Sequence, residues 1–461
     1  MRTKEAVRTR ADRVTASSLR ILQVSTYDTI GGAERVALNL SRAYRARGHD
    51  SSLAVGHKLG ADPTVLQVPN QEQHGKWTRF WLDLQSRLEA PAGRTPFTAP
   101  LRRLAGAVGE PGRTLDLYRG IEDFRFPGTW ELLTLTGQRP DIVHCHNLHG
   151  RYFDLRALPW LSMNAPVVLT LHDAWLLSGH CAHSFDCERW RTGCGHCPDL
   201  TIDPAIRRDA TALNWRRKRE IFRDSRLYVA TPSEWLMRKV RQSILAAAVV
   251  EDRVIPNGVD LAVFHPSDRR SSRATLGIAD EALVVLFAAT AIRRNIWKDY
   301  ETVREAVGRT AEQLNGRSVI FLAMGEDAPS ERIGSAEVRF LQTEPEFAAT
   351  CYTAADVYVH AARADTFPNT ILEALACGTP VVATAVGGIP EQLEEERTGF
   401  LVPAGDAHAL AERLTRLLSD DHLRQRMGMC ALEAARSRFD LQRQASDYLE
   451  WYSELVHEAK S

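Results

Sequence analysis

The sequence predicts an α/β protein built from two doubly wound, Rossmann-like domains that face each other across a cleft. The chain has 461 residues, which is enough for two ordinary hydrophobic cores. Short apolar runs alternate with helical patterns, as in parallel sheets that are covered by helices on both faces. The alternation stops once, near residue 259, and then restarts.

The N-terminal domain is expected over residues 19–258, after a disordered polar tail at 1–18. Its first strand begins at Leu19 and leads into Gly31-Gly32 and a helical pattern that ends at Gly48. Further strand-like runs follow: SSLAVG, DIVHCH, PVVLTLHD, LYVATPS and RVIPNG.

Residues 60–130 show no clear sheet pattern and are expected to form an insertion in this domain. One predicted helical face there collects five large apolar residues: Trp77, Phe80, Trp81, Leu84 and Leu88. Two interpretations stay open. The helix packs on its own domain, which we favour, or it forms an amphipathic surface that contacts a membrane or a lipid-linked acceptor.

A linker is expected at 259–279, where a proline and a Ser/Arg-rich run interrupt the pattern. The C-terminal domain is then expected over residues 280–438, and a C-terminal helix over 439–461. The strands of this domain are predicted from the runs LVVLFAA, SVIFLAMG, VRFLQ, VYVHAA and PVVATAVGG.

Composition excludes several classes of protein. Hydrophobic residues make up 44% and charged residues 25%, as in globular proteins. The 58 basic residues balance 58 acidic ones, so no global field attracts nucleic acid. We find neither an apolar run that could span a bilayer nor the apolar segment of a secretory signal. We therefore expect a cytoplasmic protein, which would act at the inner face of the plasma membrane if its acceptor is lipid-linked.

Candidate binding residues follow predicted strands in both domains, and ligands of open parallel sheets bind beyond the carboxyl ends of the strands. Five such strand ends therefore indicate one site lined from both sides. The residues are Gly31, Gly32, His172, Arg293, Lys298, Asp365, Gly387 and Gly388.

Two cations in the loop AIRRNIWKD suit a bound diphosphate. Arg293 supplies a guanidinium fork and Lys298 a point charge, and both would stabilise negative oxygens. The alternative is a solvated basic loop. For the glycine pair Gly31-Gly32 and for His172, a tight turn and a structural histidine are the corresponding alternatives.

Two carboxylates lie near the start of a helix that is predicted between Pro368 and Gly378. A helix N-terminus favours a bound phosphate. Glu373 would accept hydrogen bonds from ribose hydroxyls, and Asp365 would reach sugar hydroxyls. A helix-dipole partner and a loop cap are the simpler roles for these two residues.

These residues lie within sequence that resembles glycosyltransferase family 4, a group of retaining enzymes with the GT-B fold. The resemblance spans about residues 21–439 and is most specific in VIPNGVDLAVFHP, DTFPNTILEALACGTPVVAT, GGIPE and TGFLVPAGD. The segments HCHNLHGRYFDL and LTLHDAWLLSGHC are similar to a narrower branch that builds colanic-acid-type exopolysaccharides.

The resemblance implies roles for the candidate residues. Arg293 and Lys298 would bind the donor diphosphate, Glu373 the ribose and Asp365 the transferred sugar. The Gly31-Gly32 loop would close over the phosphates, and His172 would lie beside the sugar. A further loop would lie near sugar and phosphates: Gly387, Gly388, Ile389 and Glu391.

The family also implies a reaction. A hexosyltransferase-type enzyme would move a sugar from a UDP- or GDP-sugar to a glycan or lipid-linked acceptor, in exopolysaccharide, capsule or other cell-surface glycan synthesis. Retention would come from attack on the face that the nucleotide leaves, with the donor phosphate taking the acceptor's proton. No cofactor is needed for this step.

The chain departs from the family pattern at two positions. Asp365 stands where glutamate is usual, and Asp299 stands where the family has glycine after the lysine. The first changes the reach of the carboxylate, and the second raises the question of the loop's backbone geometry.

A cysteine cluster is the remaining motif. Cys181, Cys187, Cys194 and Cys197 have the spacing C-x5-C-x6-C-x2-C, and thiolates are preferred ligands of tetrahedral zinc. We predict a structural zinc ion, with reduced packing cysteines or disulfides as alternatives. Two other functions are weighed: a non-catalytic sugar-nucleotide-binding scaffold, and a zinc-dependent nucleic-acid-binding module that the balanced charge disfavours.

Overall fold

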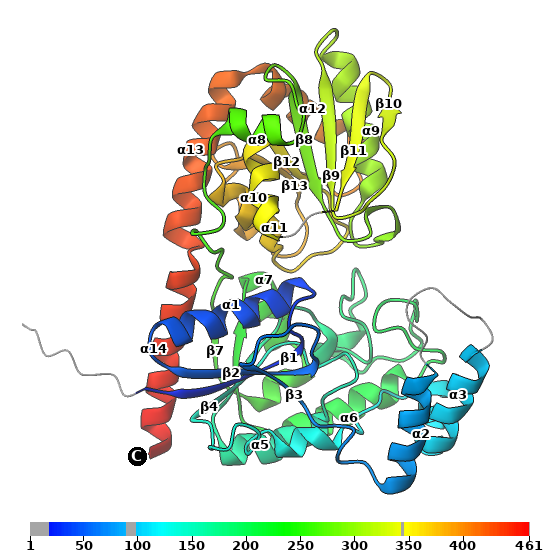
Figure 1. Cartoon of the computed structure of the whole chain (residues 1–461). Coiled ribbons are helices and arrows are strands. Elements are labelled where there is room, and N and C mark those ends of the chain that lie inside the picture. The colour runs from blue at the N-terminus through cyan, green and yellow to red at the C-terminus, as the bar shows by residue number, and fades with distance from the viewer. Residues whose placement is uncertain (1–17, 89–97, 343–344, 461) are drawn as a thin grey trace, which may run out of the picture.

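The computed structural model describes residues 18–88, 98–342 and 345–460 (Figure 1). The polar tail expected at 1–18 lies outside these residues, apart from Ser18. Two separate seven-stranded sheets form two domains, which confirms the predicted α/β architecture.

The first sheet has the order β3-β2-β1-β4-β5-β6-β7, and all of its strands are parallel. Every residue of β4 and β5 is buried, as expected for strands covered on both faces. The strands are β1 (Arg20–Tyr27), β2 (Asp50–His57), β3 (Val65–Gln67), β4 (Ile142–Cys145), β5 (Val167–Thr170), β6 (Leu227–Thr231) and β7 (Val249–Val254). The helices are α1 (Gly32–Ala46), α2 (Lys76–Arg87), α3 (Thr98–Gly109), α4 (Pro111–Tyr118), α5 (Leu158–Asn164), α6 (Thr211–Arg223) and α7 (Glu234–Arg241).

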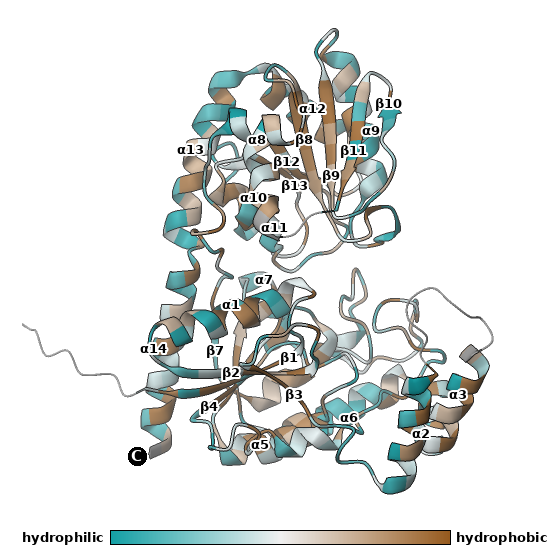
Figure 2. Cartoon of the chain, viewed as in Figure 1, coloured by the Kyte–Doolittle hydropathy of each residue, from teal (hydrophilic) through white to brown (hydrophobic). Residues whose placement is uncertain are grey.

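The second sheet has the order β10-β11-β9-β8-β12-β13-β14, and its edge strand β10 is antiparallel. Its central strands are continuous apolar runs, which Figure 2 shows in brown. The strands are β8 (Leu283–Ala288), β9 (Val319–Met324), β10 (Glu331–Ile333), β11 (Ala336–Leu341), β12 (Val357–His360), β13 (Val381–Thr384) and β14 (Gly399–Val402). The helices are α8 (Arg269–Thr275), α9 (Tyr300–Gln313), α10 (Pro345–Ala354), α11 (Asn369–Ala376), α12 (Ala407–Ser419), α13 (Asp421–Arg438) and α14 (Leu441–Lys460).

The segment 259–279, expected to be a linker, contains α8. Arg273 of this helix is 2% exposed and forms an ion pair with Asp356 at 2.8 Å. The second half of the segment is therefore packed into the C-terminal domain rather than joining the two domains loosely.

The last helix crosses back to the N-terminal domain (Figure 1). Trp451 of α14 is fully buried in a cluster with Ile21 and Leu40. The hydroxyl of Tyr448 contacts Thr170 Oγ1 at 2.8 Å. The chain thus passes between the domains twice. The two passages are hydrogen-bonded to each other, because Val259 N donates to the carbonyl of Phe439 at 2.7 Å and Leu441 N donates to the carbonyl of Val259 at 3.0 Å.

The insertion forms helices α2, α3 and α4, and α2 lies beside α3 (Figure 1). The indole nitrogen of Trp77 donates to the carbonyl of Val108 at 3.1 Å. Trp77 and Phe80 nevertheless stay 62% and 61% exposed. Helix α2 therefore packs on its neighbouring helix but leaves an apolar face uncovered.

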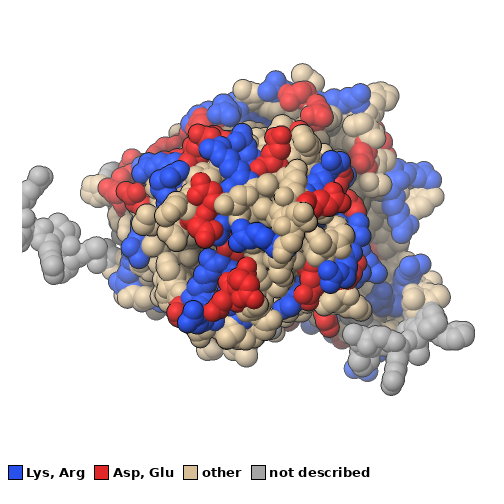
Figure 3. Space-filling model, turned by 90° about the horizontal axis from the view of Figure 1, so that it is seen from above, with Lys and Arg blue, Asp and Glu red and all other residues tan. Residues whose placement is uncertain are grey.

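Surface charge is mixed on the face shown in Figure 3, where Lys and Arg alternate with Asp and Glu and no broad patch of one sign appears. Among the described residues, no helix has both the length and the apolar character that a membrane span requires.

Candidate active site

Loops that follow strands of both sheets meet at the interface between the domains. Thr366 Oγ1 donates to the carbonyl of His172 at 2.6 Å, and Asn369 Nδ2 donates to the carbonyl of Gly32 at 3.1 Å. Residues that the sequence assigned to one site from separate domains are therefore neighbours.

Lys298 and Asp365 form a partly buried ion pair. The ammonium group of Lys298 also contacts His360 Nε2 at 3.0 Å. Burial would raise the pKa of Asp365, but the charge of Lys298 and the bond from His360 outweigh it and hold this pKa well below its usual range. Burial, with the nearby Lys298, lowers the pKa of His360 to about 4. The cluster is thus a charged pair in contact with a neutral imidazole.

Asp299 occupies the position where the resembling family has glycine, and its backbone conformation does not require a glycine. Its φ is −85°, which any residue adopts. Its backbone nitrogen donates to the carbonyl of Ala361 at 3.0 Å, and its carboxylate pairs with Arg363 at 3.4 Å. The loop after Lys298 needs no glycine in this chain.

Arg293 does not contact the Lys298 cluster. Its side chain is 48% exposed, and its Nε donates to Glu326 Oε1 at 2.8 Å. The guanidinium also lies over the ring of Phe340 at 5.2 Å from the centroid. Arg293 is therefore on the predicted loop but is engaged by a carboxylate of its own domain.

Glu373 lies in the second turn of α11 and is 6% exposed. Tyr352 donates to its Oε2 at 2.9 Å, and Arg35 approaches its Oε1 to 3.6 Å from the N-terminal domain. Burial raises the pKa of Glu373, although Arg35 and Tyr352 oppose this effect. The carboxylate is held at the domain interface by groups from both domains.

The Gly31-Gly32 turn begins α1 on the N-terminal side of the interface. Gly31 has φ +102°, and a Cβ there would lie 2.1 Å from Glu34 Oε2. Glu34 is 7% exposed, and burial raises its pKa. The first turn of α1 thus presents backbone N–H groups and two charged residues, Glu34 and Arg35, towards the interface.

His172 belongs to a histidine network that the sequence reasoning missed. Its Nε2 lies 3.0 Å from His146 Nδ1, and His146 Nε2 lies 2.6 Å from Gln23 Oε1. Burial lowers the pKa of His172 to about 4, so the ring is neutral at pH 7. The run HCHNLH at the end of β4 was the available signal, because it places several imidazoles at one strand end.

A second pair in the same place joins a histidine to a carboxylate. His149 Nε2 lies 2.7 Å from Asp173 Oδ2. Burial lowers the pKa of His149, but the charge of Asp173 outweighs burial and the net shift is upwards. The pKa of Asp173 is shifted downwards because His149 outweighs its burial. The carboxylate next to His172 therefore has a histidine partner, and each of the two groups favours the charged form of the other.

The loop Gly387-Gly388-Ile389 packs against the Asp365 segment. Gly387 has φ +58°, and a Cβ there would lie 1.7 Å from the carbonyl oxygen of Asp365. Ile389 is fully buried. Glu391 accepts hydrogen bonds from the backbone N–H groups of Glu234 and Trp235, each at 2.7 Å, at the start of α7. In this arrangement Glu391 connects the two domains.

Comparisons with known proteins agree with this architecture. The model described as Glycosyltransferase Family 4 matches residues 30–263, and the one described as Glycosyl transferases group 1 matches residues 282–420. A D-inositol 3-phosphate glycosyltransferase from Paenarthrobacter aurescens is 30% identical over 344 residues, which cover 71% of this chain and 78% of the relative. The chain belongs to glycosyltransferase family 4.

A further relative is also a glycosyl transferase, and solved structures show the same fold. The putative colanic acid biosynthesis glycosyl transferase WcaC of Escherichia coli is 26% identical over 388 residues, covering 82% of this chain and 86% of WcaC. Anabaena Alr3699/HepE in complex with UDP-glucose superposes with a TM-score of 0.61 at 18% identity, over 95% of this chain and 100% of that one. Sucrose-phosphate synthase from Thermosynechococcus elongatus has a TM-score of 0.60 at 18% identity, with the same coverage. The fold of this glycosyltransferase is GT-B, and the enzyme is of the hexosyltransferase type.

The cysteine cluster of the glycosyltransferase lies beside the domain interface, because Phe185, between Cys181 and Cys187, stacks on Trp297 of the C-terminal domain with ring centroids 5.5 Å apart. Cys181, Cys187, Cys194 and Cys197 line one small cavity, and His180 Nε2 lies 3.3 Å from Cys197 Sγ. Burial raises the pKa of Cys194 to about 12, which favours the neutral thiol. Among the described residues, no three His, Cys, Asp or Glu side chains are placed so that they could hold a metal ion. The geometry therefore gives the zinc prediction no support beyond bringing the four sulfurs to one cavity.

Proposed function

We propose that this glycosyltransferase moves a sugar from a nucleotide diphosphate sugar to a glycan or lipid-linked acceptor with retention of the anomeric configuration, in exopolysaccharide, capsule or other cell-surface glycan synthesis. The observations that support it most are the Lys298–Asp365 pair and the contacts of Glu373 and Asn369 with α1 at the domain interface. A cytoplasmic enzyme working at the inner face of the plasma membrane would have access to both substrates.

The donor would bind between the domains. Lys298 would neutralise the diphosphate, and Arg293 would join it by exchanging Glu326 for phosphate oxygens, a swap that its exposure permits. Glu373 would accept hydrogen bonds from the ribose, and Asp365 from the transferred sugar. The first turn of α1, at Gly31-Gly32, would direct backbone N–H groups towards the phosphates.

The reaction would proceed without a protein nucleophile. Lys298 would stabilise the charge that develops on the leaving diphosphate, and a phosphate oxygen would accept the proton of the attacking hydroxyl. Neutral His172 would offer an uncharged ring beside the sugar, where a cation would oppose the positive charge that grows at the anomeric carbon. No cofactor takes part in these steps.

The first donor to test is a UDP-sugar, because solved neighbours of the same fold are complexes with UDP and with UDP-glucose. A GDP-sugar is the second. The similarity to WcaC supports a role in polysaccharide synthesis.

The deciding experiment measures nucleotide release from UDP- and GDP-sugars, with and without glycan and lipid-linked acceptors. Release that depends on acceptor is expected, and the product's anomeric configuration should match that of the donor by NMR. Arg293→Ala should lower turnover on the order of a hundredfold. It should leave the thermal midpoint unchanged, since Arg293 is half exposed. Arg309→Ala is the matched control, because Arg309 is a comparably exposed arginine that pairs with Glu305 at 2.7 Å on α9.

Two outcomes would contradict the proposal. Tight donor binding without transfer to any acceptor would favour a non-catalytic scaffold. Inversion of the anomeric configuration would remove the retaining mechanism.

We also propose a structural zinc ion at Cys181, Cys187, Cys194 and Cys197, on the residue types and their convergence on one cavity. Elemental analysis of protein purified without a histidine tag should find about one zinc per chain. Cys194→Ser should lower that content. Metal-free, active protein with four titratable thiols in this segment would refute the site.

A further inference from the structure

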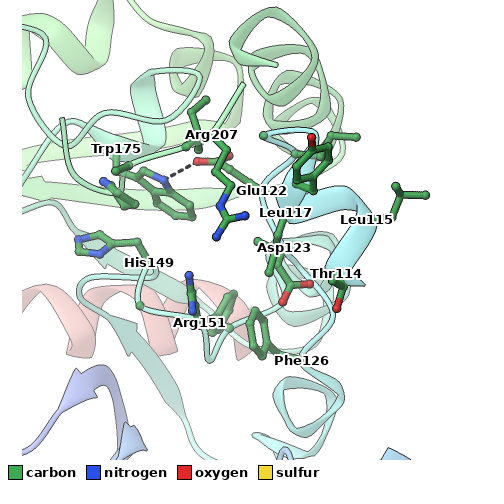
Figure 4. Close-up of a pocket in the computed structure, with 18 of the residues that line it drawn as sticks. Thr114, Leu115, Leu117, Glu122, Asp123, Phe126, His149, Arg151, Trp175 and Arg207 are labelled. Atoms are coloured by element: carbon green, nitrogen blue, oxygen red, sulfur yellow. Dashed lines mark hydrogen bonds between the residues drawn. The ribbon is translucent and has the colours of Figure 1, made fainter. Parts of the chain in front are cut away.

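A cavity of about 750 Å³ lies in the N-terminal domain, and its lining includes none of the residues assigned to the donor (Figure 4). One wall comes from α3, α4 and the loop that follows them, at residues 107–126. The loop after β4, at 148–153, forms a second wall, and Trp175 with residues 204–207 forms a third. The volume is that of an ordinary small-ligand site.

The acidic residues of this cavity are already neutralised by buried cations. Glu122 pairs with the fully buried Lys218 at 3.0 Å and accepts a hydrogen bond from Trp175 Nε1 at 2.6 Å. Asp123 pairs with Arg113 at 2.5 Å. Neither carboxylate therefore contributes an uncompensated negative charge to the cavity.

The two arginines of the cavity are not neutralised. Arg151 and Arg207 are exposed, and neither side chain has an ion pair or a hydrogen bond with any residue that the structure describes. In Figure 4 the two guanidinium groups extend into the same space from opposite sides. The cavity therefore has a net positive field that suits a phosphate or diphosphate, which arginine binds through two parallel N–H groups.

The remaining lining is apolar and continues onto the surface. Inside the cavity it includes Leu117 and Phe126. At its rim and on the neighbouring helices, six large apolar side chains are 47% to 62% exposed: Trp77, Phe80, Leu101, Leu104, Leu115 and Tyr118. These exposed apolar residues lie on three adjoining helices, α2, α3 and α4, and suit contact with an apolar partner.

The cavity reaches the reaction site through His149. This residue lines the cavity and binds Asp173 at 2.7 Å, and Asp173 adjoins His172 at the domain interface. A ligand held between Arg151 and Arg207 would thus lie on the side of the interface opposite to Lys298.

We propose that this cavity binds the acceptor of the sugar transfer, and that the acceptor is a lipid-linked phosphate or diphosphate. Its phosphate would lie between Arg151 and Arg207, its lipid chain along the apolar surface of α3 and α4, and its sugar towards His149. The class of acceptor rests on the proposed function, whereas the binding of an anionic lipid is independent of it.

The test is calorimetric titration of the full-length protein without donor. Farnesyl phosphate in detergent micelles is the probe, and farnesol and glucose 1-phosphate separate the contributions of phosphate and chain. The variant Arg151→Ala/Arg207→Ala should weaken farnesyl phosphate binding roughly tenfold or more, because charge-assisted hydrogen bonds are lost. It should keep the wild-type thermal midpoint, since neither side chain bonds to the described protein. Arg119→Ala is the control, because Arg119 is exposed just after α4 but does not line the cavity.

Preferential binding of farnesyl phosphate, lost in the double variant and kept in the control, would support the site. Equal affinity for glucose 1-phosphate would make the ligand a free phosphorylated sugar and overturn the lipid. Equal affinity for farnesol, unchanged affinity of the double variant, or no binding would overturn the site itself. None of these readouts uses a nucleotide, so a failure of the donor assay would not be mistaken for a failure here.

Discussion

Replacing Lys218 with methionine tests whether a buried ion pair holds the insertion onto the N-terminal domain. The ammonium group is fully buried and pairs with Glu122 at 3.0 Å. It also donates to the carbonyls of Trp175 at 2.9 Å and Ser178 at 3.1 Å, and it lies 3.9 Å from the centroid of the Trp175 ring. Methionine keeps the length of the side chain but makes none of these bonds.

The expected loss is large because the Glu122 carboxylate stays behind. Glu122 is 8% exposed, and Trp175 Nε1 is its remaining side-chain donor among the described residues. Removing one partner of a buried ion pair costs about 3–5 kcal/mol. The double variant Lys218→Met/Glu122→Gln removes the isolated charge as well, and we expect it to regain more than half of the lost free energy of unfolding.

Urea unfolding, followed by tryptophan fluorescence and by circular dichroism, measures these differences. The two probes must agree before a free energy is taken from the midpoint, since two domains can unfold separately. Lys58→Met is the control, because Lys58 donates to a neutral acceptor, the carbonyl of Val65, at 2.8 Å. A loss below about 1 kcal/mol for Lys218→Met would refute the reasoning, since that is the value of an exposed pair. So would a double variant no more stable than the single one.

Three further predictions concern the interface between the domains. Lys298→Ala should abolish most turnover and also lower the thermal midpoint, because Asp365 loses its partner. The double variant Lys298→Ala/Asp365→Asn should restore the midpoint but not the activity. Calorimetry measures the midpoint, and an enzyme assay measures the activity. Glu391→Ala removes two hydrogen bonds between the domains and should raise the radius of gyration by small-angle scattering, so an unchanged scattering curve would contradict this role. Finally, the lowered pKa values of His172 and His360, about 4 instead of 6.5, mean that the unfolded chain binds more protons between these values. The contribution of these histidines to the free energy of unfolding should therefore be complete above pH 6.5. It should fall by on the order of 3 kcal/mol per histidine as the pH drops towards 4. The fall should be shallower in the variant His360→Asn.

The alternation of apolar runs and helical patterns predicted most strands of both sheets, but it missed β10, β14 and β3, which pairs with β2 inside the segment 60–130 where no sheet was expected. Buried parallel strands such as β5 and β8 are continuous apolar runs whichever partners they acquire, so their signal is local. The positions of the loops that follow these strands could be predicted for the same reason. Lys298 and Asp365 were expected on one site, and they meet.

What the sequence did not predict depends on partners far away in the chain. Lys218 lies in the run WRRKRE, which looks like a solvated basic face, and its carboxylate partner Glu122 is 96 residues away. The contacts of Glu391 with the start of α7, 156 and 157 residues away, were not foreseen, and its predicted place near the donor stays a prediction. The pairing of Arg293 with Glu326 was not foreseen either, and its predicted binding of the diphosphate likewise stays a prediction. Charged side chains are long and can reach several partners, so local spacing does not determine which of these partners they bind.

The paired passages of the chain at Val259 and Leu441 restrict how the domains can move. Two backbone segments that are hydrogen-bonded side by side allow rotation of the domains about one axis, but not about all axes. Opening and closing would leave the bonds between Val259, Phe439 and Leu441 intact, whereas twisting one domain against the other would break them. A protease cut at either passage alone would leave the two halves attached through the other. After such a cut, the enzyme is expected to give two bands on a denaturing gel. It should still elute as one molecule in native chromatography.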